Sequence, residues 1–158
     1  MVDVTDAVGK LGRIEQKDLV CDLAGIIAPY GSVDTDVVAP AVFADLSARL
    51  VDAPSAASAL PTEQECQRVV ERFSDEPGGA GFFAFGAVVH LLYACQAVRG
   101  DPDGAVNCTK RFLDLLGAAD DDGQVGLYDE SLRYLAAPSP NRRLALVTRV
   151  RAHAEALV

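Results

Sequence analysis

The chain has no tryptophan, and aromatic residues make up only 6% of its 158 residues. A β-sandwich core is rich in aromatic and β-branched side chains, so this scarcity argues against that class. A core built mainly from Leu, Val and Ala favours close-packed helices instead. With 50% hydrophobic and 23% charged residues, the composition is that of a folded soluble domain rather than a disordered chain.

Basic residues are also scarce. The sequence has 14 Lys and Arg against 23 Asp and Glu, which gives a formal net charge of −9 at pH 7. A protein that binds nucleic acid through its phosphates needs a surplus of cationic side chains, so we expect no nucleic-acid partner. The acidic excess fits either a solubilising surface or a surface that binds a basic protein.

Several chemical motifs are missing as well. The four cysteines, at positions 21, 66, 95 and 108, form no C-x-x-C pair, and neither zinc nor any other metal site is predicted. No glycine-rich phosphate loop is present, so the common nucleotide cofactors are not expected. The first residues carry no secretory signal pattern, and we therefore predict a cytoplasmic protein with reduced thiols.

Apolar residues at helical spacing predict an all-α fold, a single domain over residues 1–158 with about seven helices. The predicted helices are 19–27, 34–51, 62–73, 82–98, 102–116, 127–137 and 139–158. Pro29 and Gly31 are expected to end the first of them. Residues 52–61 are small and polar and are bounded by proline, and this composition predicts a linker inside the domain.

Residues 82–98 are apolar almost all round, which is typical of the central helix of a bundle, surrounded by amphipathic ones. The alternative is a membrane span, which needs about 20 apolar residues and basic flanks to orient it. This run is shorter, carries His90 and Gln96, and has no basic flanks. We therefore predict no membrane association.

The stretch that follows, residues 97–108, has aspartates and a glycine that resemble a calcium loop. The EF-hand pattern fails because Phe112 stands where its glutamate ligand is required. The same residues fit the end of one helix and the start of the next. Gly100 suits a left-handed helix end, Asp101 an N-cap and Pro102 the first helical position.

Later positions support short amphipathic helices. We expect Ala105, Thr109, Phe112 and Leu116 to share a buried face. In the predicted helix 127–137, the expected buried face consists of Tyr128, Leu132 and Leu135. In the predicted helix 139–158, it consists of Leu146, Val150 and Leu157. Between these segments, residues 117–126 form a second acidic loop that also fails the calcium pattern.

No catalytic residues are predicted. The sequence has two histidines, His90 and His153. If either lay beside Cys95 or Tyr93 in the core, the histidine would be the base and its neighbour the nucleophile. No nucleophile-elbow motif accompanies them. A histidine hydrogen-bonded inside a helical core is the simpler interpretation, and we favour it.

Three segments appear in a characteristic order: LVCDLAGIIAPYG, then VFADLSARL, then the glycine-led GFFAFGAVVHLLYACQAV. In this arrangement, which covers roughly residues 8–118, the chain resembles an uncharacterised family of small helical bacterial cytoplasmic domains. The resemblance implies an all-α fold. It implies no particular activity.

Two function classes follow. The first is a non-catalytic protein-interaction domain whose acidic surface binds a basic partner, for example an immunity or antitoxin-type protein that masks a toxin. Its predicted partner surface consists of Asp101, Asp103, Asp120, Asp121 and Asp122.

The alternative is a small-molecule-binding protein or an enzyme with a pocket between helices, since bundle cores can hold such sites. The predicted lining of this pocket is Phe85, His90, Tyr93 and Cys108.

Overall fold

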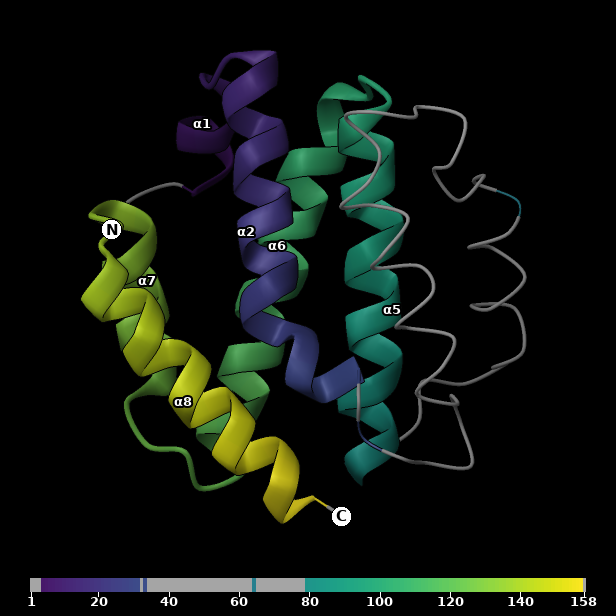
Figure 1. The fold of residues 1–158 in the computed structure, drawn as a ribbon. Helices are drawn as coiled ribbons and strands as arrows, with labels where there is room; N and C mark the ends of the chain where they lie inside the picture. Colours follow the sequence, from purple (N-terminus) through teal and green to yellow (C-terminus); the bar gives the residue numbers. More distant parts are fainter. Residues whose placement is uncertain (1–3, 32, 34–63, 65–78, 158) are drawn as a thin grey trace.

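The computed structural model describes residues 4–31, 33, 64 and 79–157. They form an all-α bundle, as the sequence predicts (Figure 1). The helices of this described part are α1 (Val4–Gly9), α2 (Arg13–Gly31), α5 (Gly79–Val98), α6 (Pro102–Asp121), α7 (Leu127–Ala136) and α8 (Pro140–Ala156). The helices predicted at 34–51 and 62–73 and the linker predicted at 52–61 lie outside the described residues.

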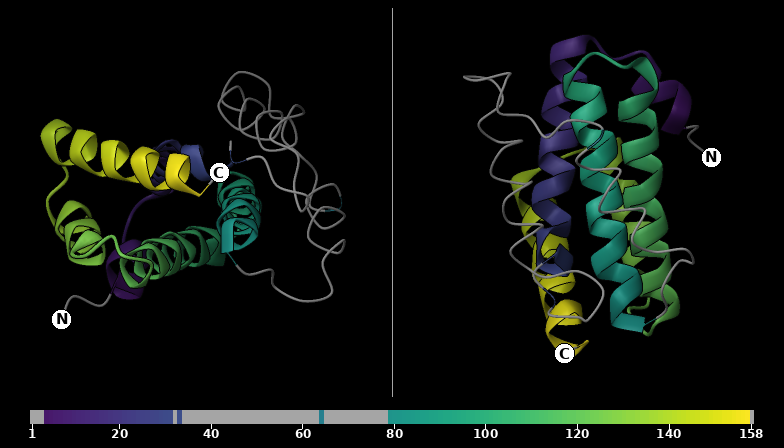
Figure 2. Two further views of the ribbon diagram at one scale, coloured as in Figure 1. Left: turned by 90° about the horizontal axis from the view of Figure 1, so that it is seen from below. Right: turned by 90° about the vertical axis from the view of Figure 1, so that its right-hand side faces the viewer.

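Helix α5 is buried around its whole circumference. Every residue from Phe83 to Leu92 is buried, a run of about three turns. Both α2 and α6 pack against it, and the three helices lie side by side (Figure 2). By length and composition α5 is the one described helix able to cross a membrane, but 72% of its most apolar window is buried. This is the burial that a core helix needs.

Two glycines allow α6 to approach α5 closely. A Cβ atom added to Gly104 would lie 2.4 Å from the backbone nitrogen of Ala97. A Cβ atom added to Gly86 would lie 2.5 Å from Cδ2 of Leu115. Gly104 thus lets the two helix backbones approach each other, and Gly86 leaves room for the Leu115 side chain between the helices.

The joint between α5 and α6 is built as predicted. Gly100 has a left-handed φ of 97°, and the Asp101 carboxylate accepts a hydrogen bond of 2.9 Å from the Asp103 N–H. Ser139 caps α8 in the same manner, its hydroxyl accepting from the Arg142 N–H at 3.2 Å. The predicted buried face of α6 is confirmed at Ala105, Thr109, Phe112 and Leu116.

The predicted bounds of α2 and α6 were wrong. Helix α2 begins at Arg13 rather than at residue 19, and it does not end before Pro29 but continues to Gly31. Proline removes only one helical hydrogen bond, and burial of Tyr30, which is 0% exposed, holds the last turn in place. Helix α6 likewise extends through Asp121, so the first part of the expected acidic loop is its last turn.

Two predicted buried faces were also partly wrong. In α7 the buried residues are Leu127, Ser131 and Tyr134, one position away from the predicted face. Both faces of this short helix carry apolar side chains, and the contact of Tyr134 with α2 selects the register. In α8, Leu146 and Val150 are buried as predicted, while Leu157 at the helix end is only partly buried.

The close approach of α5 and α6 yields a paired prediction. Gly104→Ala should lower the free energy of unfolding by about 1–3 kcal/mol, because its Cβ meets backbone that cannot move aside. Gly117→Ala is the matched control in the same helix, since its Cβ would be 3.5 Å from the Tyr128 ring. It should raise stability by up to about 1 kcal/mol. Urea unfolding measures both, and equal effects would contradict the proposed packing.

Candidate functional site

His90 and Cys108 form a buried contact between α5 and α6. The His90 Nε2 lies 3.0 Å from the Cys108 Sγ, and both side chains are 0% exposed. Burial, followed by the charge of Arg111, lowers the pKa of His90 to about 3. Burial also raises the pKa of the Cys108 thiol well above its usual value. At neutral pH the pair is therefore imidazole and thiol, without the thiolate that a nucleophilic cysteine requires.

His153 lies in a hydrogen-bonded chain that joins three elements. Its Nδ1 is 2.9 Å from the Tyr30 hydroxyl of α2, and its Nε2 is 2.8 Å from Oδ2 of Asp122, the C-cap residue of α6. Burial, then the charge of Asp122, raises the pKa of Tyr30, so the phenol keeps its proton. With a neutral imidazole, the Tyr30 hydroxyl donates to Nδ1 and the Nε2–H donates to the Asp122 carboxylate. The Phe83 ring packs edge-on against His153, with centroids 4.9 Å apart.

An Asp–His–hydroxyl chain is also the arrangement that activates nucleophiles in hydrolases. Here the hydroxyl belongs to Tyr30, which is 0% exposed, and only the Asp122 end reaches solvent, with its side chain 56% exposed. A substrate has no route to the phenol oxygen in this arrangement. The chain therefore holds helices together, and the favoured interpretation of His153 as a hydrogen-bonded core histidine agrees with this geometry.

A second polar cluster links α2 to α7 and α8. Asp22 of α2 accepts a hydrogen bond from the Tyr134 hydroxyl of α7 and one of 2.6 Å from Nε of Arg143 in α8. Burial, then the hydrogen bond to Asp22, raises the pKa of Tyr134 to about 12. These contacts fix α7 and α8 against α2.

The five predicted partner-binding aspartates do not form one surface. Helix α6 has 20 residues and is about 30 Å long, with Asp101 and Asp103 at its start and the other three at its end. Several of the carboxylates also have structural roles. Asp101 is an N-cap, Asp122 binds His153, and Oδ2 of Asp120 accepts a hydrogen bond of 3.0 Å from the Tyr128 N–H. Asp120, Asp121 and Asp122 lie together at the C-terminal end of α6, next to the start of α7.

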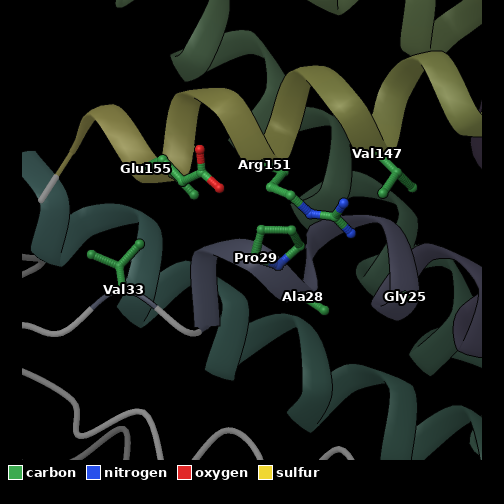
Figure 3. Close-up of a pocket in the computed structure, with 8 residues that line it drawn as sticks. Gly25, Ala28, Pro29, Val33, Val147, Arg151 and Glu155 are labelled. Carbon is green, nitrogen blue, oxygen red and sulfur yellow. The ribbon is translucent and has the colours of Figure 1, made fainter.

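Of the four residues predicted to line a pocket, the structure brings His90 and Cys108 into contact. Phe85 is buried with the Arg111 guanidinium 6.0 Å from its ring centroid, and Tyr93 is partly buried. A pocket of about 430 Å³ lies elsewhere, between α2 and α8 (Figure 3). Its lining contains none of the four predicted residues.

The turn between α6 and α7, residues 122–126, lies in the predicted acidic loop, but the sequence did not reveal its contacts with α8. The Arg149 guanidinium of α8 donates to the Val125 carbonyl at 2.9 Å and to the Glu130 carboxylate at 2.8 Å. His153 holds Asp122 at the other end of the turn. Val125 itself is 80% exposed. The sequence signal was an isolated valine within a run of acidic and glycine residues.

No protein-family model, curated protein or solved structure matches this chain. The family resemblance drawn from the order of its segments stays a prediction. Within the described residues, no group of three or more His, Cys, Asp or Glu side chains is placed to hold a metal ion. A proposal for the function therefore rests on the geometry of the α6–α7 turn and of the buried histidines.

The hydrogen-bonded chain through His153 predicts an effect of removing one hydroxyl. Tyr30→Phe should lower the free energy of unfolding by about 1–2 kcal/mol, because it leaves Nδ1 of His153 buried without a donor. Tyr128→Phe removes the same atom from a side chain that is 38% exposed and should change stability little. Urea unfolding of the two variants tests this, and equal midpoints would refute it.

The lowered pKa of His90 predicts a pH dependence. His90 binds a proton near pH 6.5 in the unfolded chain and only near pH 3 in the folded chain. Its full contribution to the free energy of unfolding is therefore present above pH 6.5. It is lost as the pH falls from 6.5 towards 3, by about 2 kcal/mol at pH 5.

Urea unfolding at pH 7.5 and pH 5 measures this loss. His90→Leu removes the titrating group, so its stability should fall by about 2 kcal/mol less than that of the wild type over the same interval. Identical falls, or nitrogen chemical shifts showing His90 as imidazolium at pH 5, would contradict the assignment.

Proposed function

We propose that this protein is a non-catalytic interaction domain that binds a basic protein partner through the α6–α7 turn. The observation that carries the proposal is the fixed presentation of an exposed valine among carboxylates. Val125 is 80% exposed, and Asp121, Asp122 and Asp129 are exposed in the chain around it. A cytoplasmic immunity or antitoxin-type protein that masks a basic toxin is one concrete form of this function.

The composition of the turn is that of a small interface. Protein interfaces combine an apolar centre with a polar or charged rim. Here Val125 and the 38% exposed Tyr128 supply the apolar centre, and the three aspartates supply the rim. A partner that fits has Lys or Arg side chains around a shallow apolar depression. The net charge of −9 would steer such a partner towards this domain.

The turn is also ordered before any partner binds. Arg149 holds the Val125 carbonyl, His153 holds Asp122, and the Asp120 carboxylate holds the first turn of α7. A surface that is already fixed loses little conformational entropy on association, which strengthens binding. This arrangement favours recognition by rigid docking over a loop that folds around its partner.

The buried histidines support the non-catalytic part of the proposal. His90 is neutral and faces a protonated thiol, while His153 faces a phenol that solvent does not reach. In the alternative, a ligand pocket or active site beside His90, the imidazole would act through Nδ1, because its Nε2 faces Sγ of Cys108.

The proposal is tested with a photo-crosslinking residue placed at position 125 or, as a control, at position 14 of the full chain in cells. Ile14 is 77% exposed and lies at the start of α2, so the control matches in exposure and differs in place. We expect one protein to crosslink from position 125 and not from position 14. Equal crosslinking from both positions would overturn the proposal.

Affinity for the purified partner then tests the chemistry of the turn. Val125→Ser should weaken binding by about tenfold or more, and Ile14→Ser should not. The double variant Asp121→Asn with Asp129→Asn should bind more weakly, and its affinity should depend less on salt. The control double variant, Asp103→Asn with Asp114→Asn, removes the same charge elsewhere and should change neither the affinity nor its salt dependence. Affinity that is independent of salt and of Asp121 and Asp129 would contradict an acidic interface.

A further inference from the structure

A groove with the volume of a small-molecule site lies between the C-terminal half of α2 and α8. Its volume is about 430 Å³, within the range of ligand pockets. Figure 3 shows α8 along one wall and the last turns of α2 along the other. The residues that line it are Gly25, Ala28, Pro29, Val33, Val147, Arg151, Ala154 and Glu155.

The floor of this groove is apolar. Ala28, Pro29 and Val33 line it from the side of α2, and Val147 and Ala154 from α8. None of these side chains carries a hydrogen-bonding group, so an alkyl chain is the kind of group that gains by lying against them. Gly25 has no side chain and so leaves space in the groove at its end of α2.

One cation reaches over this apolar floor. The Arg151 side chain extends from α8 across the groove towards α2 (Figure 3). The other three arginines of α8 have oxygen partners: Arg142 binds backbone carbonyls, Arg143 binds Asp22 and Arg149 binds Glu130. Within the described part of the chain, Arg151 has neither an ion pair nor a side-chain hydrogen bond. Its guanidinium is therefore available to an anion from outside.

A second guanidinium borders the same end of the groove. A Cβ atom added to Gly25 would lie 2.6 Å from Nη2 of Arg143, so this cation lies directly over the glycine. Glu155, four residues after Arg151 on α8, lines the opposite end. Along α8 the lining residues follow in the order Glu155, Arg151 and Val147, so Arg151 lies between a carboxylate and an apolar side chain (Figure 3).

We infer that this groove binds a small organic carboxylate with an unbranched apolar tail. The carboxylate forms a two-pronged hydrogen bond with Arg151, because guanidinium geometry matches the two carboxylate oxygens. The tail lies over Ala28, Pro29 and Val147. A single negative charge is favoured over a dianion, because Glu155 and the net charge of −9 repel additional negative charge. This site is separate from the α6–α7 turn.

Decanoate is the probe for this site, titrated below its micelle-forming concentration into the isotope-labelled full chain. We expect saturable amide shifts at Val33, Val147 and Ala154. Arg151→Gln should weaken binding by about tenfold, as expected for loss of a charged hydrogen bond. Arg133→Gln, which removes an exposed arginine from α7, is the matched control and should leave the affinity unchanged.

Decyltrimethylammonium carries the same tail with the opposite charge and should give no saturable shifts at these amides. Equal binding of the two amphiphiles, or equal decanoate affinity of the wild type and Arg151→Gln, would overturn the inference. Absence of saturable decanoate shifts would overturn it too. Binding of a hydrophobic peptide with a free C-terminal carboxylate, with no response to decanoate, would replace the small ligand with a protein partner.

Discussion

The burial of α5 is the constraint on which the rest of the structure depends. A helix that is apolar on every face is stable in water only when other helices cover it. Both α2 and α6 pack directly against it, and the glycines at positions 86 and 104 let α6 come close. The outer sides of these two helices then carry α8 and α7, respectively. The groove and the α6–α7 turn exist because this stack is fixed.

The polar groups inside the bundle connect its core to its surface. The chain from Tyr30 through His153 to Asp122 begins beside Phe83 of α5 and ends at the α6–α7 turn. The turn is therefore held by the same packing that buries α5. His90 differs, because its partner Cys108 is equally buried and the pair has no route to solvent. His153 thus helps to fix the α6–α7 turn at the surface, whereas His90 contacts the buried Cys108 inside the core.

Features that depend on neighbouring residues could be predicted from the sequence. The joint at Gly100 and Asp101 follows from glycine conformation and capping, and both act within a few residues. The buried face of α6 follows from helical spacing in the same way. Proline rules failed at Pro29 because burial of the adjacent Tyr30 outweighs the loss of one hydrogen bond.

Features that depend on distant residues could not be predicted in this way. Tyr30 and His153 are 123 positions apart, and no spacing rule relates them. The same holds for Arg149 and the carbonyl of Val125, a contact that turns an acidic loop into a fixed surface. The groove likewise depends on how α8 lies on α2, and the sequence pattern of Arg151 alone does not reveal it. The contacts of Asp120 with the Tyr128 N–H and of Asp122 with His153 depend on the three-dimensional fold in the same way.

Native-state hydrogen exchange in buffer without detergent tests the central claim that α5 is the core helix of the folded bundle. The amides of residues 83–92 should be the slowest to exchange among the described helices, with an opening free energy equal to that of global unfolding. The short helix α1 should exchange much faster. Exchange in α5 as fast as in α1, or protection of α5 that requires added detergent, would contradict the account.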